Sequence, residues 1–217
     1  MTLVKICGIT NEEDALAALE AGAGLLGFNF YARSPRCVAA VDARRIIERL
    51  PETILSVGVF VNDDVESVVR VASEAGVGAV QLHGDESPEF CARVRRELKM
   101  KASVNFIVKA LRVGDDFSVE TAARFETDAV LLDAYARDIW GGTGRTFDWS
   151  VARRTREVVG RLILAGGLTV ENVGEAVETV MPYTVDVCSG VESAPGRKSF
   201  QLMRSFVEAV RAADSES

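Results

Sequence analysis

The sequence predicts a single-domain (β/α)8 barrel of the TIM type, and three observations point to this fold class. Eight short apolar runs alternate with eight longer amphipathic segments along the 217 residues. Such alternation is typical of a parallel sheet covered by helices, and a chain of this length can bury one large core. No Pro- or Ser-rich linker divides the chain. We therefore expect one barrel domain over residues 1–212, followed by a short flexible tail over residues 213–217.

The first four strand–helix units are marked by apolar periodicity and by helix start signals. Thr10 or Asn11 precedes an acidic stretch, and Ser87 followed by Pro88 is typical of a helix cap with Pro at the first helical position. Apolar residues recur at three- and four-residue spacing in each helical segment. The predicted strands are 3–7, 25–30, 54–61 and 79–82, and the predicted helices are 12–21, 42–50, 64–75 and 88–98.

The last four units follow the same pattern. Each apolar run is short enough for a strand, and each segment between the runs carries apolar residues on one helical face. An open doubly wound sheet is the alternative to a closed barrel, but no Rossmann-type glycine fingerprint follows the first strand. The predicted strands are 106–110, 129–133, 162–165 and 184–188, and the predicted helices are 119–125, 150–159, 171–180 and 199–212.

Composition and charge exclude several classes of function. The net charge of −7 argues against a nucleic-acid-binding protein, because phosphate neutralisation needs a basic face, although a local basic pocket for one phosphate is compatible with it. The four cysteines form no CxxC pair and have no zinc spacing, so we expect a reducing cytoplasm. The single histidine, His83, argues against a His-rich metal site. No apolar run approaches the roughly 20 residues that a membrane span requires, and the first residues resemble a strand and not a signal peptide.

Strand parity predicts polar side chains inside the barrel. Side chains of a barrel strand alternate between the interior and the helix layer. Burial of such groups without partners is costly, and the carboxyl ends of barrel strands carry the active site in this fold. We therefore expect an active site at that mouth. With Cys7 inward at the end of the first strand, the inward residues are predicted to include Lys5, Gln81, His83, Ile107, Lys109, Asp133, Asp186 and Cys188.

Glycine-containing segments follow the sixth, seventh and eighth predicted strands. They comprise residues 141–144, 165–169 and 189–192. Glycine lets backbone N–H groups approach an anion closely, and phosphorylated substrates are commonly bound by the last loops of a barrel. Each segment alone is also compatible with a tight turn. Together they predict a phosphate site that contains Gly144, Gly166, Gly167, Ser189 and Gly190.

Eight sequence motifs resemble those of the phosphoribosylanthranilate isomerase family. The resemblance covers nearly the whole chain, and the motifs occur in the same order. One departure is Cys188, where a serine is the more familiar residue. In chain order the motifs are KICGIT (5–10), GF with SPR (27–28 and 34–36), GVFVN (58–62), VQLHGDE (80–86), LLD (131–133), GGTG before FDW (141–144 and 147–149), AGGL (165–168) and DVCSGVE (186–192).

The resemblance implies an activity in tryptophan biosynthesis. The reaction is the Amadori rearrangement of N-(5-phosphoribosyl)anthranilate to 1-(2-carboxyphenylamino)-1-deoxyribulose 5-phosphate. A general acid protonates the furanose oxygen so that the ring opens to a Schiff base, and a general base then removes the C2′ proton. The resemblance implies no metal and no organic cofactor for this aldose–ketose change. It implies a small-molecule substrate, and the sequence leaves a homodimer open.

The resemblance implies Cys7 as the general base and Asp133 as the general acid. A thiol with an ordinary pKa of about 8.5 must lose its proton more readily to act as a base, and Lys5 is a candidate cation for that purpose. A carboxyl with an ordinary pKa of about 3.9 must retain its proton, and Asp186 is a candidate neighbouring carboxylate. Arg36 fits the carboxylate of the anthranilate ring, because a planar guanidinium binds a carboxylate through two hydrogen bonds.

Several alternatives remain open from the sequence. Lys109 would suit a Schiff-base aldolase, since such a lysine lies at the end of a barrel strand, although the resemblance gives it no such role. A metal-dependent epimerase would need more histidines than His83, and the histidine-pathway isomerase would favour Asp where Cys7 stands. A bifunctional isomerase and a non-catalytic phosphoribosyl-binding protein also fit the barrel. The residues expected to bind the substrate, besides Arg36, are Lys5, Gln81, His83 and Asp186. Cys37, Cys91 and Cys188 are expected to be structural.

Overall fold

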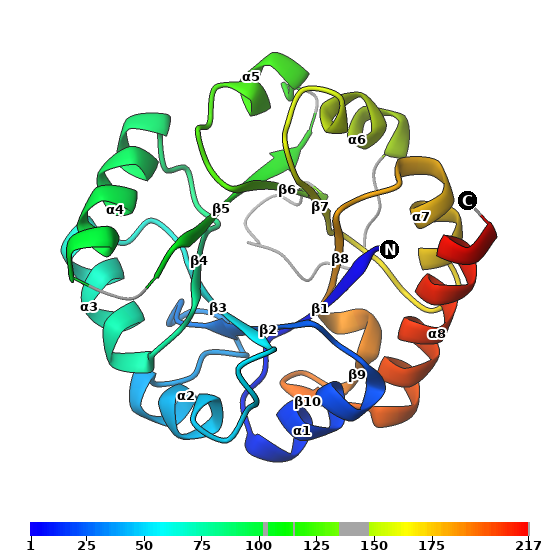
Figure 1. Cartoon of the computed structure of the whole chain (residues 1–217), viewed down its shortest axis with the longest axis horizontal. Coiled ribbons are helices and arrows are strands. Elements are labelled where there is room, and N and C mark those ends of the chain that lie inside the picture. Colours follow the sequence, from blue (N-terminus) through cyan, green and yellow to red (C-terminus); the bar gives the residue numbers. More distant parts are fainter. Residues whose placement is uncertain (102–103, 115, 135–147, 217) are drawn as a thin grey trace.

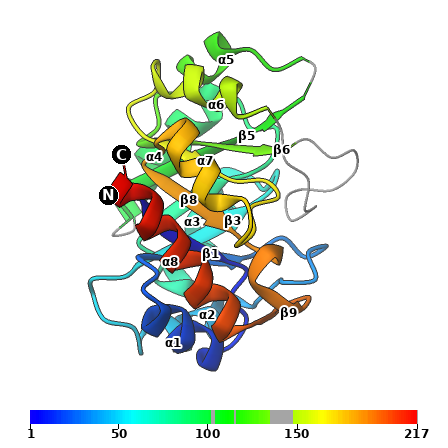
Figure 2. The ribbon, with the colours of Figure 1, turned by 90° about the vertical axis from the view of Figure 1, so that its right-hand side faces the viewer.

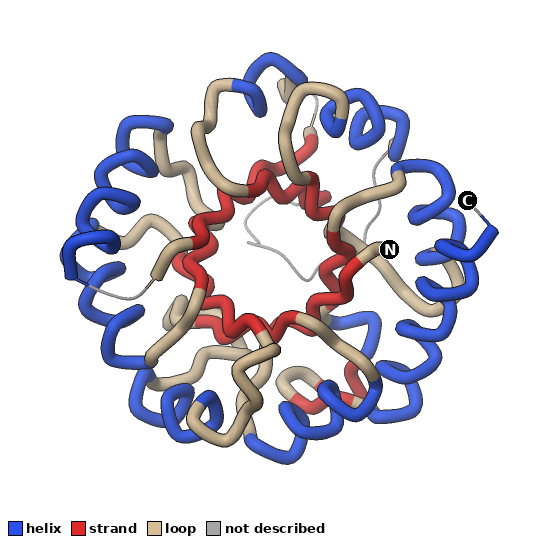
Figure 3. Tube along the Cα trace, in the orientation of Figure 1, coloured by secondary structure: helices blue, strands red, loops and turns tan. Residues whose placement is uncertain are grey.

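The computed structural model describes residues 1–101, 104–114, 116–134 and 148–216 of the chain. Within these residues, eight parallel strands form a closed barrel in chain order, and helices surround it (Figure 1, Figure 3). The ring closes where β1 (Leu3–Cys7) pairs with β8 (Thr184–Val187) on one side and with β2 (Leu25–Asn29) on the other. This closure confirms the predicted barrel and excludes the open doubly wound sheet.

The remaining elements overlap the segments predicted for them. No described helix has the length and apolar character needed to cross a membrane. The other barrel strands are β3 (Leu55–Phe60), β4 (Ala79–Leu82), β5 (Phe106–Val113), β6 (Ala129–Ala134) and β7 (Leu162–Leu164). The helices are α1 (Glu12–Ala21), α2 (Ala40–Ile47), α3 (Val65–Ala75), α4 (Pro88–Lys101), α5 (Val119–Ala123), α6 (Trp149–Arg156), α7 (Val173–Val180) and α8 (Phe200–Glu216).

Helix ends are fixed by local side-chain chemistry. Asn11 is the cap of α1, and its side-chain oxygen accepts a hydrogen bond of 2.8 Å from the backbone N–H of Asp14. Asp64 caps α3 in the same way. Both helices end at a glycine in the left-handed conformation, Gly22 and Gly76, which satisfies the last carbonyl groups at little steric cost. These signals are local, and the sequence therefore predicts the bounds of α1 correctly.

Strand β5 has the opposite parity to the one predicted. Val108 pairs with Gln81 of β4 and with Ala129 of β6, and it belongs to an apolar cluster inside the barrel. Ile107 and Lys109 therefore face the helix layer, although both were expected to point inward. The residues of β5 around them are apolar on both faces, so hydrophobic alternation could not reveal which face was inside.

Lys109 lies in the wall between the barrel and its helices. Its ammonium group donates to Glu86 over 2.6 Å and to the carbonyl of Gly84 over 2.7 Å, and it lies 5.9 Å from the centre of the Phe125 ring. The side chain of Lys109 is only 1% exposed. The lysine is thus held by the protein outside the barrel, which removes the basis for the aldolase alternative.

A small hairpin follows the last barrel strand and was not predicted. A 3-10 turn, η1 (Ser189–Val191), leads into β9 (Glu192–Ala194), which pairs antiparallel with β10 (Arg197–Lys198). The hairpin is tied to α1, because the backbone N–H of Lys198 donates to Asp14 over 2.9 Å. Figure 2 shows β9 at the end of the barrel opposite to the termini. Strands of two and three residues are too short for periodicity to indicate them.

Helix α8 continues beyond the predicted end of the domain. It runs to Glu216, whereas residues 213–217 were expected to form a flexible tail outside the barrel. The Asp214 carboxylate accepts a hydrogen bond of 2.6 Å from the backbone N–H of Thr2, and Ala213 is buried. The described part of this segment therefore belongs to the barrel domain. The polar composition of the segment concealed this contact, because its partner lies at the other end of the chain.

Candidate active site

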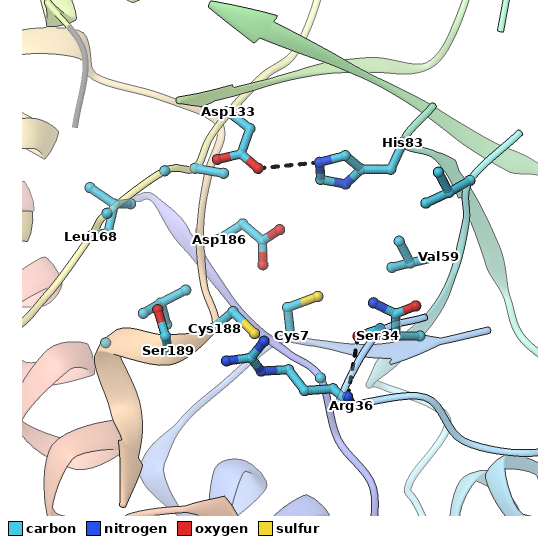
Figure 4. A pocket seen from close by; sticks show the side chains of 18 residues that line it. Cys7, Ser34, Arg36, Val59, His83, Asp133, Leu168, Asp186, Cys188 and Ser189 are labelled. Atoms are coloured by element: carbon cyan, nitrogen blue, oxygen red, sulfur yellow. Dashed lines mark hydrogen bonds and ion pairs between the residues drawn. The ribbon is translucent and has the colours of Figure 1, made fainter. Parts of the chain in front are cut away.

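One cavity opens at the carboxyl ends of the barrel strands, and most of the predicted site residues line it (Figure 4). Its walls come from the ends of the strands and from the loops that follow them. The lining residues are Cys7, Gly8, Asn29, Ser34, Arg36, Val59, Val61, His83, Asp133, Ala165, Gly166, Gly167, Leu168, Asp186, Val187, Cys188, Ser189 and Gly190.

Cys7 ends β1 and presents its thiol to the cavity. Gly27 on the neighbouring strand makes room for it, since a Cβ there would come within 2.8 Å of Cys7 Sγ and 3.2 Å of Lys5 Nζ. The pKa of Cys7 lies well below its ordinary value: the Cys188 thiol lowers it most, burial opposes the change, and Lys5 and Lys198 lower it further. A thiolate is therefore favoured at Cys7, as a general base requires.

Lys5 lies beneath Cys7 and does not line the cavity. Its ammonium group is fully buried and donates to Asp186 over 2.8 Å. Burial lowers the pKa of Lys5, but Asp186 and Cys7 outweigh burial and raise it above its ordinary value. Lys5 is thus a permanently charged group. The structure therefore does not support the prediction that Lys5 binds the substrate, because its side chain is covered and reaches Asp186 instead.

Asp186 stands between Cys7 and Asp133 in the cavity (Figure 4). Burial raises the pKa of Asp186 to about 6, although Lys5 opposes that change. One of its oxygens, Oδ1, is buried and has no hydrogen-bond partner among the described residues. A bound ligand hydroxyl would satisfy this oxygen, because a buried carboxylate oxygen without a partner is costly.

Asp133 lies across the cavity from Cys7 and is held by a short chain of polar contacts. Asp133 Oδ2 is 3.2 Å from His83 Nε2, and His83 Nδ1 is 2.8 Å from Gln81 Nε2. Gln81 is buried below the mouth and does not line the cavity. Gln81 and His83 point inward as predicted, but of the three residues in this chain of contacts only His83 and Asp133 line the cavity.

The loops after β7 and β8 form a backbone-rich wall of the same cavity. Gly166 and Gly167 have φ angles of 89° and 65°, a conformation that favours glycine. A Cβ on Gly190 would overlap the carbonyl of Leu168, so only glycine allows these two loops to meet. Ser189 adds a hydroxyl group beside Gly190. The fifth residue expected at this phosphate site, Gly144, lies outside the described residues.

Arg36 lines the cavity on the side of β1 and β8, and one edge of its guanidinium is already occupied. Its Nε and Nη2 atoms donate to Glu192 over 2.8 and 2.7 Å. Lys198 donates to the same carboxylate over 2.9 Å. Glu192 was not predicted as a site residue, although it belongs to the DVCSGVE motif, and no sequence pattern indicated Lys198.

The arrangement combines a thiolate, a carboxyl group and two regions suited to anions in one cavity. Among the described residues, no group of three His, Cys, Asp or Glu side chains is placed to hold a metal ion. All four cysteines are free thiols. Asn29 and Ser34 also line the cavity with Arg36 and were not predicted from the sequence. Such a site can add and remove protons on opposite sides of a small phosphorylated molecule.

Comparison with known proteins agrees with this chemistry. Residues 4–209 match the family model described as N-(5′-phosphoribosyl)anthranilate (PRA) isomerase. The chain is 50% identical to the N-(5′-phosphoribosyl)anthranilate isomerase of Geobacter sulfurreducens over 207 residues, which cover 95% of this chain and 97% of the relative.

Solved structures give the same result. The phosphoribosyl anthranilate isomerase of Thermotoga maritima has a TM-score of 0.87 and 40% identity, with 98% of this chain and 100% of that chain covered. A phosphoribosyl anthranilate isomerase in complex with reduced 1-(o-carboxyphenylamino)-1-deoxyribulose 5-phosphate has a TM-score of 0.85 and 39% identity over 98% of this chain and 100% of that one. The chain therefore belongs to the phosphoribosylanthranilate isomerase family.

Proposed function

We propose that this chain isomerises N-(5′-phosphoribosyl)anthranilate to 1-(2-carboxyphenylamino)-1-deoxyribulose 5-phosphate. The observation that carries the proposal is the placement of Cys7 and Asp133 on opposite sides of one cavity at the barrel mouth. The relatives named for this reaction cover almost the whole chain. The reaction needs an acid and a base that act on different atoms of one sugar, and these two side chains are arranged for that purpose.

In the first step, Asp133 donates a proton to the furanose oxygen. The C1′–O bond breaks, and the electron pair of the anthranilate nitrogen forms the Schiff base. The contact of 3.2 Å between Asp133 and His83 fixes the direction of the carboxyl group. Asp133 must hold its proton before this step and is a carboxylate after it.

In the second step, the Cys7 thiolate removes the proton from C2′. The electrons of the C2′–H bond form the enolamine. A proton then adds at C1′ while the C2′ hydroxyl releases its own proton, so the ketone forms and both Cys7 and Asp133 return to their starting protonation states. The reaction transfers hydrogen within the substrate and needs no external oxidant. Lys5 favours the thiolate before this step and is too strongly paired with Asp186 to act as the acid itself.

Substrate binding uses the two ends of the cavity. We infer that the phosphate is bound by Gly166, Gly167, Ser189 and Gly190, whose loops present backbone N–H groups, with Gly144 as a further expected contact. Arg36 then binds the ring carboxylate, and Asp186 accepts hydrogen bonds from sugar hydroxyls. Below the cavity, Gln81 orients the His83 ring through a hydrogen bond, and Lys5 supplies a positive charge next to Asp186.

Growth of a tryptophan auxotroph that lacks this isomerase tests the proposed function. We expect the chain to restore growth without added tryptophan. Failure to restore growth, with the protein present in soluble form, would contradict the proposal. Assay of the purified protein with the histidine-pathway aminoimidazole substrate separates a bifunctional enzyme, and binding of the product without turnover would indicate the non-catalytic alternative.

Assembly and location are further proposals. We infer a homodimer, because one related isomerase of Thermotoga maritima is described as dimeric and because Leu3, Met181 and Tyr183 are apolar side chains exposed on this chain. Light scattering would report a single-chain mass if that inference is wrong. We infer a cytoplasmic enzyme from its free thiols and its biosynthetic reaction.

A further inference from the structure

Glu192 is a buried carboxylate that the mechanism above does not use. It begins β9, and its side chain is only 5% exposed. The two oxygens accept hydrogen bonds from Arg36 Nε and Nη2 and from Lys198 Nζ, all between 2.7 and 2.9 Å. The backbone N–H of Gly196 donates to it over 3.2 Å. Burial of a carboxylate carries a large desolvation penalty, which these hydrogen bonds offset. Glu192 lies at the edge of the ligand cavity.

The geometry of the pair leaves a defined part of Arg36 for a ligand. A guanidinium has two edges that can each bind a carboxylate through two hydrogen bonds, one through Nε and Nη2 and one through Nη1 and Nη2. Glu192 occupies the first edge. The Nη1 atom has no hydrogen-bond partner among the described residues, and the side chain lines the cavity. The second edge is therefore the one available to an incoming carboxylate.

The charge of the cluster also favours an anion. An arginine paired with one carboxylate would be neutral overall and would attract a second carboxylate weakly. Lys198 is fully buried and donates both to Glu192 and to the backbone carbonyl of Cys188, over 2.9 and 3.0 Å. Two cations thus surround one carboxylate, and the cluster keeps one positive charge in excess. Lys198 also fixes the hairpin to the end of β8.

We propose that Glu192 is a positioning residue: it holds the Arg36 guanidinium so that its Nη1–Nη2 edge meets the aryl carboxylate of the substrate, while Lys198 preserves the positive charge. The inference rests on the proposed function and extends it to how the carboxylate is recognised. The hydrogen bonds that Arg36 donates to Glu192 raise the pKa of Arg36 above its ordinary value. Burial raises the pKa of Glu192, but Arg36 and Lys198 outweigh it and keep the group ionised.

A comparison of two ligands tests the inference. The first is reduced 1-(o-carboxyphenylamino)-1-deoxyribulose 5-phosphate, and the second is the same compound without the ring carboxylate. Calorimetry gives the ratio of their dissociation constants for the wild type and for Glu192→Gln. We expect the variant to reduce the preference for the carboxylate ligand by roughly tenfold, with the dissociation constant of the second ligand unchanged.

The sign of the effect separates positioning from simple charge neutralisation. If Glu192 only neutralised Arg36, its replacement by Gln would leave more positive charge and would tighten binding of the carboxylate ligand. An unchanged or larger preference in Glu192→Gln would therefore overturn the inference. So would a wild type that does not distinguish the two ligands. Steady-state turnover should show a raised KM with kcat nearly unchanged, because the contact is made equally before and during reaction.

Controls keep this test independent of folding and of the proposed function. Glu208→Gln makes the same chemical change in an exposed Arg204–Glu208 pair on α8 and should leave both dissociation constants unchanged. If Glu192→Gln does not fold, Glu192→Asp keeps the charge, withdraws the carboxylate, and should lose part of the preference. Ligand binding needs no turnover, so an inactive wild type that still shows this pattern would contradict the proposed function and support the inference.

Discussion

Three neighbouring side chains, Cys188, Lys5 and Lys198, favour the thiolate form of Cys7. The thiol ends β1, has the charged ammonium of Lys5 beneath it, and lies in the cavity beside Cys188. Lys198 Nζ is 3.8 Å from Cys188 Sγ, so a second buried cation faces the two sulfur atoms. A base is useful only when it is deprotonated in the free enzyme, and these neighbours favour that state. Cys188, where the resemblance led us to expect a serine, therefore lies next to the thiol that we propose as the base.

The acidic limb of the pH–rate profile should depend on Cys188. The lowered pKa of Cys7 means that kcat/KM falls only when pH drops through that lowered value. Cys188→Ala removes the largest influence that lowers it, so the limb should move to higher pH. Cys91→Ala, at a buried cysteine of α4 outside the cavity, should leave the limb in place. An unchanged midpoint in Cys188→Ala would refute this role.

The presence of Cys7 and Asp133 in the cavity could be predicted from the sequence, whereas their surroundings could not. Cys7 and Asp133 stand at the ends of apolar runs within specific motifs, which is local information. The partner of Arg36 is Glu192, which lies 156 residues away along the chain. The family resemblance implied Arg36 as a ligand for the ring carboxylate, and the structure shows that one edge of its guanidinium is bound to Glu192. Long-range pairing of charged groups leaves no local pattern.

At the scale of secondary-structure elements, β5 shows where pattern reasoning fails. The strand is buried on both faces, because its inner side chains fill the barrel and its outer ones lie under helices. Alternation is then absent, and parity must be taken from the neighbours with which the strand pairs. This is why Lys109 was placed inside the barrel by sequence and outside it by structure.

Lys109 should matter for stability and not for chemistry. Lys109→Met leaves Glu86 buried without its cation, and removal of one partner of a buried pair costs about 3–5 kcal/mol. Urea unfolding should show this loss, while kcat per folded molecule stays near that of the wild type. The double variant Lys109→Met with Glu86→Gln should recover part of the stability. A large loss of kcat at unchanged stability would contradict the assignment.

Gly190 should be intolerant of a side chain. A Cβ at this residue would overlap the Leu168 carbonyl, so Gly190→Ala must displace the loops that we assign to phosphate. Overpacking of this kind costs about 1–3 kcal/mol of folding stability, and we expect the displaced loops to bind a phosphate-bearing ligand roughly tenfold more weakly. Gly174→Ala, in α7 where nothing lies within 4 Å, is the matched control and should not weaken binding. Equal affinities in the two variants would exclude the steric account.

At the scale of the whole molecule, both the ring of strands and the surrounding layer of helices are closed. The strands close where β1 pairs with β8, and the helix layer closes where α8 contacts the start of the chain. The alternation of strands and helices predicted the first closure, because eight units need a ring. It could not predict the second, nor the β9–β10 hairpin that carries Glu192 and Lys198 to the mouth.

The link between Asp214 and Thr2 should contribute to the stability of the whole barrel. Asp214 accepts hydrogen bonds from both the backbone N–H and the hydroxyl of Thr2, over 2.6 and 2.8 Å. Asp214→Ala leaves these donors without their partner, and we expect a loss of about 1–3 kcal/mol in thermal or urea unfolding. Asp42→Ala, in an exposed pair with Arg45, should change stability by less than about 0.5 kcal/mol. Equal effects would show that the link is not structural.

Turnover of freshly prepared N-(5′-phosphoribosyl)anthranilate, followed by the loss of its fluorescence, tests the central claim most directly. The wild type, Cys7→Ser and Asp133→Asn are compared after each is shown to bind the reduced product analogue. A hydroxyl is too weak an acid to supply the base, and an amide cannot donate the required proton. We expect each variant to lose about 10²–10⁴ in kcat with the analogue still bound. Wild-type rates in either variant would contradict the assignment of base and acid in this cavity.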